Sequence, residues 1–255
     1  MQQSIRESIE SSKVYKKIDS SIIDETIEKE TPKYKKSKDI EQSVRKKLHA
    51  WVSMFFLDYQ KLQKEIESSD NIDEILPLLL QNHVSTKERL DFISQMIKDI
   101  DETIPDIKSI LDLGCGLNPI AYLLYSDNKN VEYMAVDVEK SAIELLNLCF
   151  SKMNANAKAI VGDVKKVQIT NVDAVFMFKL LPLLEQQEKG SSEKLINKIN
   201  SKYYCISFPT KSMSGKNVGM YNKYKSDIDL LAAKCKLKPI FEKEYKNEIL
   251  FILQK

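Results

Sequence analysis

The sequence contains no long apolar run, and this shortage excludes whole classes of protein. None of its segments reaches the roughly 18 consecutive apolar residues that a membrane-spanning helix needs. The stretch from Met1 to Arg6 is polar and is not followed by the apolar core of a signal peptide. We therefore expect a cytoplasmic protein without a membrane partner.

Cysteine and histidine are also scarce. The four cysteines, Cys115, Cys149, Cys205 and Cys235, are far apart in the chain and lie in apolar contexts, which is typical of buried free thiols in a reducing compartment. With only 2 histidines, the chain lacks the ligand spacing of a zinc site. The sequence predicts no metal site.

Net charge is nearly absent, because 39 basic residues face 37 acidic ones. Any affinity for nucleic acid must therefore come from local patches. One such patch lies between residues 31 and 50, where seven basic residues accompany two acidic ones. This stretch is either a solvated helix face or a surface that contacts phosphates. Its basic residues are Lys33, Lys35, Lys36, Lys38, Arg45, Lys46 and Lys47.

Two regions of the chain differ in hydrophobic pattern. In residues 1–76 apolar residues recur at helical spacing, as at Ile18, Ile22 and Ile27, and a second amphipathic segment spans residues 44–66. This region predicts a small helical module. In the second region, residues 77–255, apolar, strand-like runs alternate with helical stretches from Lys108 on. This alternation predicts a mostly parallel sheet covered by helices on both faces.

The second region contains seven expected strands. The last two have no helix between them and should form a hairpin, which places one antiparallel strand in the sheet. The strands are expected at residues 110–113, 133–136, 159–161, 173–178, 203–208, 240–244 and 249–253. Helices are expected at residues 119–125, 139–153, 183–199 and 221–235.

Glycine is rare, at 6 residues, so the pair Gly114 and Gly116 directly after the first expected strand is informative. Glycines permit a tight turn and close approach of a ligand to the backbone. Asn118 is suited to cap the next helix, with Pro119 at its first position. Asp137 ends the following strand, where a carboxylate accepts both hydroxyls of a ribose. This arrangement favours a nucleoside cofactor.

The identity of the cofactor follows from what the turn lacks. A dinucleotide fingerprint needs a third glycine where Pro119 stands, and proline removes an N–H group that a pyrophosphate would use. S-adenosylmethionine (SAM) has no phosphate, and a terminal hairpin is typical of SAM-dependent methyltransferases. We therefore predict a class I, Rossmann-like methyltransferase sheet at residues 77–255. The alternative is a structural turn that binds no cofactor.

Two further side chains have a functional and a structural interpretation. Asp163, after Gly162 at the end of the third strand, either accepts a hydrogen bond from the adenine amine or is a solvated loop residue. Ser85 and Glu88 match a capping box, which predicts a helix starting at Ser85. Arg89 on that helix is either a surface residue or the fork that holds the methionine carboxylate of SAM.

The reaction is indicated by the end of the fourth strand. Residues 176–182 lack the Asn/Asp-Pro-Pro-aromatic motif of enzymes that methylate exocyclic amines, and no catalytic cysteine is evident. N7 of guanine remains attractive, because its lone pair is free and no base is needed to remove a proton. Catalysis would then rest on orientation and proximity. The basic loop at residues 208–221 suits an RNA backbone and a flipped base, or is simply a solvated loop.

Five segments together resemble the aminoglycoside-resistance 16S rRNA methyltransferases. They are residues 47–49, 83–89, 111–119, 179–187 and 207–216, and they keep the family's order and spacing. The resemblance implies transfer of a methyl group from SAM to N7 of guanine 1405 in the assembled 30S subunit. It also implies resistance to aminoglycosides of the gentamicin and kanamycin type.

The resemblance also implies roles for individual residues. His83, Val84, Ser85 and Arg89 would line the methionine end of SAM, Gly114 would approach its backbone, and Asp137 would take the ribose. Gly162 and Asp163 would take the adenine, with Phe178, Gln187 and an aromatic near Phe55 completing the pocket. The RNA contacts implied are Lys46, Lys47, Lys87, Lys211 and Lys216. The family often has Arg at the last three positions, and Lys keeps the charge without the fork.

Two rival functions stay open from the sequence. A SAM-dependent enzyme acting on a small molecule would leave the basic helices unexplained. A non-catalytic RNA-binding relative would bind the subunit without adding a methyl group. We expect 16S rRNA in the 30S subunit as the partner and no DNA partner. The oligomeric state is not encoded in any pattern that we recognise, and a monomer is favoured.

Overall fold

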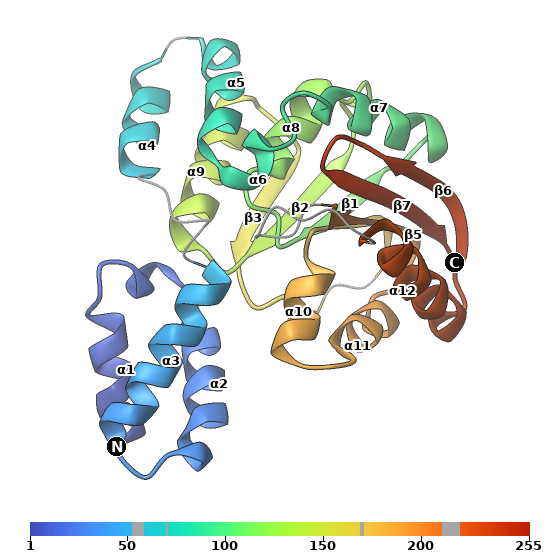
Figure 1. Cartoon of the computed structure of the whole chain (residues 1–255). Coiled ribbons are helices and arrows are strands. Elements are labelled where there is room, and N and C mark those ends of the chain that lie inside the picture. The colour runs from blue at the N-terminus through green and yellow to red at the C-terminus, as the bar shows by residue number, and fades with distance from the viewer. Residues whose placement is uncertain (53–58, 70, 169–170, 211–219) are drawn as a thin grey trace.

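The computed structural model describes residues 1–52, 59–69, 71–168, 171–210 and 220–255. Its centre is a seven-stranded sheet in the order β3-β2-β1-β4-β5-β7-β6 (Figure 1). Strand β7 is antiparallel to both of its neighbours, and the other strand pairs are parallel. The predicted sheet with one antiparallel strand is therefore confirmed. The strands are β1 (Ser109–Leu113), β2 (Glu132–Asp137), β3 (Ala157–Val161), β4 (Val172–Phe178), β5 (Ser201–Pro209), β6 (Lys238–Glu244) and β7 (Glu248–Gln254).

Helices cover both faces of this sheet. One apolar core joins the sheet to the helices that come before β4, and a second joins its other face to the helices that come after β4. The helices of the first face are α4 (Tyr59–Ser68), α5 (Ile72–Asn82), α6 (Val84–Lys87), α7 (Ile93–Thr103), α8 (Asn118–Tyr125) and α9 (Lys140–Lys152). Those of the second face are α10 (Leu181–Gln187), α11 (Ser191–Lys198) and α12 (Met220–Cys235).

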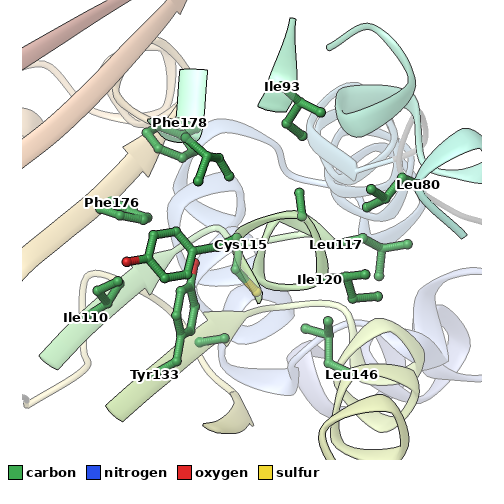
Figure 2. Close-up of a cluster of buried hydrophobic side chains, with 14 of the residues drawn as sticks. Leu80, Ile93, Ile110, Cys115, Leu117, Ile120, Tyr133, Leu146, Phe176 and Phe178 are labelled. Carbon is green, nitrogen blue, oxygen red and sulfur yellow. The ribbon is translucent and has the colours of Figure 1, made fainter. Parts of the chain in front are cut away.

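Aromatic rings form the part of the first core that lies nearest the centre of the sheet. The rings of Tyr133 on β2 and Phe176 on β4 are 6.3 Å apart, and Phe176 stacks on Phe178 at 5.1 Å (Figure 2). Tyr122 of α8 contacts both Tyr133 and Phe176. Burying an aromatic side chain of this size contributes roughly 1.5–3 kcal/mol to stability. These rings fix the carboxyl end of β4, where Phe178 is the last residue.

The first three helices form a lobe with its own core (Figure 1). They are α1 (Gln2–Glu10), α2 (Ser20–Glu30) and α3 (Ser37–Val52), with short 3-10 turns at Tyr15–Lys17 and Thr31–Lys33. Their core contains buried isoleucines at the predicted helical spacing. The lobe joins the sheet through the backbone, because the Asp19 N–H donates to the Val138 carbonyl at 2.8 Å, beside an antiparallel bridge between Ile18 and Glu139.

The division between the two regions differs from the sequence expectation. The boundary expected after residue 76 falls inside α5, and α4 packs on α9 and on the sheet-facing core through Tyr59, Leu62 and Ile66. The expected amphipathic segment 44–66 is divided between α3 and α4. Apolar periodicity alone does not show which core a helix face joins.

Two other expectations about helices are corrected. The helix expected at residues 183–199 is two helices, α10 and α11, separated at Gly190, whose φ of 81° favours glycine. Ser85 does not cap a helix, because the four-residue α6 begins at Val84 without a side-chain cap. Instead Thr86 donates its hydroxyl to the carbonyls of Leu80, at 2.7 Å, and His83, at 3.1 Å.

The four cysteines are free and buried, as predicted. Among the described residues, no helix has the length and apolar character needed to cross a membrane. No group of three or more potential metal ligands was found in the same residues.

Candidate functional site

The loop between β1 and α8 brings a glycine turn to the carboxyl edge of the sheet. Gly114 has φ 64° and Gly116 has φ 50°, a left-handed backbone that favours glycine. A Cβ atom at Gly116 would lie 2.6 Å from Cε1 of His83, so His83 packs directly against this glycine. The amides of Gly114 and Cys115 donate to the Val136 carbonyl at 2.9 and 3.2 Å, which ties the turn to β2.

Asp137 lies at the end of β2, beside this turn. Its Oδ2 accepts the Gly116 N–H at 2.9 Å, and its Oδ1 accepts the Glu139 N–H at 3.1 Å. Burial raises the pKa of Asp137, although these backbone donors act in the opposite direction. The carboxylate is thus held in place by the loop and remains half-buried. The ribose role expected of Asp137 stays a prediction.

Asp163 follows β3 in the corresponding position. Its Oδ1 accepts the Lys165 N–H at 2.9 Å. Its Oδ2 is buried and accepts no hydrogen bond from the described residues, although Lys165 and Lys166 approach it at 3.8 and 3.9 Å. A buried acceptor without a donor costs free energy unless a ligand supplies one. The exocyclic amine of an adenine is a donor of the required kind, so the site fits the nucleoside of SAM.

Arg89 is buried rather than exposed, and its fork is engaged. Its Nε and Nη2 donate to the two oxygens of Glu248 at 2.7 and 2.8 Å, and its guanidinium lies 5.2 Å from the centre of the Phe178 ring. Arg89 follows the short α6 instead of lying within a helix. The alternative of a surface arginine is therefore wrong. Glu248 uses two of the five N–H donors of Arg89, and the other three do not contact Glu248.

Asp112 and Glu139 lie next to the glycine turn and Asp137, and the sequence analysis did not single them out. Asp112, the second-to-last residue of β1, is buried and accepts hydrogen bonds from Asn118, at 2.8 Å, and Tyr133, at 2.7 Å. Burial raises its pKa to about 6. Asn118 therefore faces Asp112 and does not cap α8, contrary to expectation. Glu139 caps α9 through the amides of Ser141 and Ala142, and burial raises its pKa to about 7.

The other predicted cofactor residues divide into two groups. His83 directly precedes α6, and Val84 and Ser85 are the first two residues of that helix. Burial and the nearby cations Arg89 and Lys179 lower the pKa of His83 to about 4. Gln187 ends α10 and lines cavities together with Trp51 and Lys29, and no residue of α6 is among those that line them. Phe55 lies outside the described residues. The role of each residue toward SAM stays a prediction.

The predicted RNA contacts lie on different elements. Lys46 and Lys47 on α3 line a groove of about 480 Å³ between the lobe and α10. Lys47 pairs with Glu30 at 2.6 Å, whereas Lys46 is exposed and makes no ion pair within the described part of the chain. Lys87 is exposed on α6. Lys211 and Lys216 fall outside the described residues.

Taken together, the strand order, the glycine turn and the carboxylates after β2 and β3 define a SAM-dependent methyltransferase fold. The sequence profile described as "Ribosomal RNA methyltransferase (FmrO)" matches residues 11–239. The chain belongs to this family of ribosomal RNA methyltransferases, which confirms the resemblance noted in the sequence.

Three similar proteins illustrate this relationship. The chain is 30% identical over 240 residues to a 16S rRNA (guanine(1405)-N(7))-methyltransferase of Proteus mirabilis, covering 86% of this chain and 85% of that one. It is 27% identical over 207 residues to the enzyme of the same name from Micromonospora echinospora, covering 78% and 74% of the two chains. The crystal structure of the 16S rRNA methyltransferase RmtF with S-adenosyl-L-homocysteine superposes with a TM-score of 0.87 at 24% identity, covering 100% of this chain and 98% of that one.

Proposed function

We propose that this protein transfers the methyl group of SAM to N7 of guanine 1405 in the 16S rRNA of the assembled 30S subunit. The observation that carries the proposal is the match to the Proteus mirabilis enzyme of that name over 86% of this chain and 85% of that one. Methylation there would confer resistance to gentamicin- and kanamycin-type aminoglycosides.

The residues of the site fit SAM. Asp137 would hold the ribose and Asp163 the adenine amine, because each is a carboxylate held by backbone amides at the carboxyl edge of a neighbouring strand. Arg89 would hold the methionine carboxylate with N–H groups that Glu248 does not use. The left-handed glycines of the β1–α8 turn let a ligand approach the backbone.

Methyl transfer to N7 requires little from the protein beyond placing SAM and the guanine next to each other. SAM supplies an electrophilic methyl group, and guanine N7 offers a lone pair without losing a proton. Within the described residues, β4 ends in Phe178 and is followed by Lys179, without the Asn/Asp-Pro-Pro-aromatic motif. In well-oriented cases, orientation and proximity alone lower the reaction barrier by about 7–11 kcal/mol.

The decisive experiment is transfer of a labelled methyl group to purified 30S subunits, followed by borohydride and aniline treatment. Chain scission marks N7-methylguanine, and the length of the fragment identifies the nucleotide. We expect one cut at guanine 1405. Turnover of a small molecule without ribosomes would favour the small-molecule enzyme. Binding to 30S subunits without methyl incorporation would favour the non-catalytic relative.

A further inference from the structure

Glu248 is the centre of a buried charge cluster at the cofactor edge of the sheet. It begins β7, and because β7 is antiparallel, this end lies beside the carboxyl end of β5. Glu248 is 0% exposed and Arg89 is 2% exposed. Lys179, directly after β4, approaches Glu248 with its Nζ at 3.2 Å. Ser207 on β5 donates its hydroxyl to the same carboxylate.

Two cations of the cluster share one fully buried carboxylate. Arg89 and Lys179 contribute two positive charges, and Glu248 contributes one negative charge. Lys179 also contacts Glu88 at 2.7 Å, and the Glu88 side chain is 50% exposed. Burial alone would raise the pKa of Glu248, yet the two cations outweigh burial and lower it. Because Arg89 and Lys179 share the one fully buried carboxylate of Glu248, a further carboxylate placed beside the two cations would be stabilised.

The backbone of Lys179 is held in an unfavourable conformation that aims it into the cluster. Its φ is 58°, which is uncommon for a lysine. The Lys179 N–H donates to the Ser207 carbonyl at 3.0 Å and to the Ser207 hydroxyl at 3.1 Å. Ser207 thus fixes both the Lys179 backbone and the Glu248 carboxylate. Backbone strain of this kind is concentrated at binding and catalytic sites.

We propose that Lys179 is a second cation for the methionine carboxylate of SAM, next to Arg89, and that Glu248 holds the two cations side by side. Glu248 uses two of the five N–H donors of Arg89, and Lys179 has three N–H donors for its two carboxylate neighbours. Each cation therefore keeps donors for a further carboxylate. This inference rests on the proposed use of SAM and assigns a binding residue to the same site.

The alternative is that the cluster only braces the fold. A bracing role predicts that loss of Lys179 disturbs every ligand of the site equally. A carboxylate subsite predicts a selective effect on ligands that carry the amino-acid group. Two available compounds separate these cases, because 5′-methylthioadenosine has the adenosine and thioether of S-adenosylhomocysteine but no carboxylate.

The experiment is titration calorimetry of the full-length Lys179→Met variant with both compounds. Loss of one charge-assisted contact should weaken S-adenosylhomocysteine binding by about tenfold and leave methylthioadenosine binding unchanged. Lys179→Arg, which keeps the charge, should recover most of the lost affinity. Lys234→Met is the control, because Lys234 on α12 is also paired with a glutamate, Glu193 on α11 at 3.0 Å, outside the cluster around Glu248. It should change neither affinity.

Each outcome decides the matter. Equal weakening of both compounds, or no change in either, overturns the role of Lys179. In both cases a wild-type protein that binds S-adenosylhomocysteine leaves the proposed function standing. A wild-type protein that binds neither compound overturns the proposed function and this inference together. Because methylthioadenosine binding reports a folded adenosine pocket, a folding defect in the variant cannot be mistaken for selective loss.

Discussion

The Asp137 carboxylate links the glycine turn to the proposed ribose site. Substitutions of Asp137 therefore test whether its charge or only its hydrogen-bonding oxygens are needed for SAM binding. Asp137→Ala removes the acceptor of the Gly116 and Glu139 amides together with the proposed ribose contact. We expect SAM binding to be abolished in calorimetry. Asp137→Asn keeps one acceptor oxygen and should retain weak binding, reduced by about 1.5–3 kcal/mol for the lost charged hydrogen bond. Unchanged affinity in Asp137→Ala would exclude the ribose role.

His83 should make stability depend on pH. Its pKa in the folded protein is about 4, first because of burial and then because of Arg89 and Lys179, against about 6.5 in an unfolded chain. Between these values the unfolded state binds more protons, so stability falls as pH falls from about 6.5 toward 4. At pH 5 the loss due to His83 should be about 2 kcal/mol, since one pKa unit corresponds to about 1.4 kcal/mol.

The measurement is urea unfolding of the wild type and of His83→Gln at pH 8 and pH 5. Comparison of the two proteins cancels the carboxylates, including Asp112 and Glu139, whose raised pKa values act with the opposite sign. The stability difference between wild type and variant should shift by about 2 kcal/mol against the wild type at pH 5. Parallel pH profiles would show that His83 does not titrate in this way.

For single residues, the sequence predicts where a carboxylate lies better than it predicts which residue pairs with it. Asp137 and Asp163 are found at strand ends, as expected, because the ends of parallel strands meet at one edge. The partner of Arg89 is 159 residues away, at the start of an antiparallel strand. No local pattern marks Glu248 as a site residue, since a glutamate before an apolar run resembles an ordinary strand end. Its pairing depends on the order of strands in the sheet.

Among the structural elements, the β1–α8 turn tolerates the smallest range of backbone conformations and side chains. Gly116→Ala would add a Cβ atom 2.6 Å from the His83 ring in a left-handed conformation. The conformation alone costs about 1–2 kcal/mol, and the contact adds to it. We expect a loss of at least about 2 kcal/mol in denaturant unfolding.

Gly162→Ala is the matched control for that substitution. A Cβ atom at Gly162 would be no closer than 3.7 Å to a neighbour, and its φ lies outside the left-handed region. Its effect on stability should be within about 0.5 kcal/mol. If both substitutions proved equally mild, the close packing of His83 on the turn would be wrong.

Strands were predictable from the sequence to within a few residues, whereas helix packing was not. Buried parallel strands are continuous apolar runs bounded by polar residues, and all seven appear at the expected places. The segment 44–66 shows a single apolar face, but its two halves join different cores. Periodicity specifies that a face is buried and leaves its partner undetermined.

For the whole molecule, α2 connects the lobe to both proposed nucleoside loops. The residue before it, Asp19, donates its N–H to Val138, next to the proposed ribose carboxylate. Further along α2, Glu25 pairs with Lys165 at 2.7 Å, next to the proposed adenine carboxylate Asp163. A ribosome bound to the lobe would therefore act on the same helix that borders the proposed SAM site. This link arises from three distant chain segments and has no signature in any one of them.

The groove between the lobe and α10 is where we expect a phosphate of the ribosomal RNA to bind. Of its lysines, Lys33 and Lys47 pair with the buried Glu30, whereas Lys46 makes no ion pair among the described residues and remains available to a phosphate. Lys46→Glu should weaken 30S binding and reduce the slope of log affinity against log salt by about 1. SAM affinity should not change.

Lys202→Glu provides the control for Lys46→Glu, because Lys202 is an exposed lysine at the opposite, amino-terminal end of β5. Both substitutions alter net charge equally, so a general electrostatic effect would reduce the slope in both variants. Filter-binding measurements over a range of salt concentrations distinguish the two cases. A reduced slope in Lys46→Glu alone places the phosphate contact in the groove, because counterion release depends on contacts rather than on net charge. Equal slopes in both variants would mean that α3 presents only a solvated face.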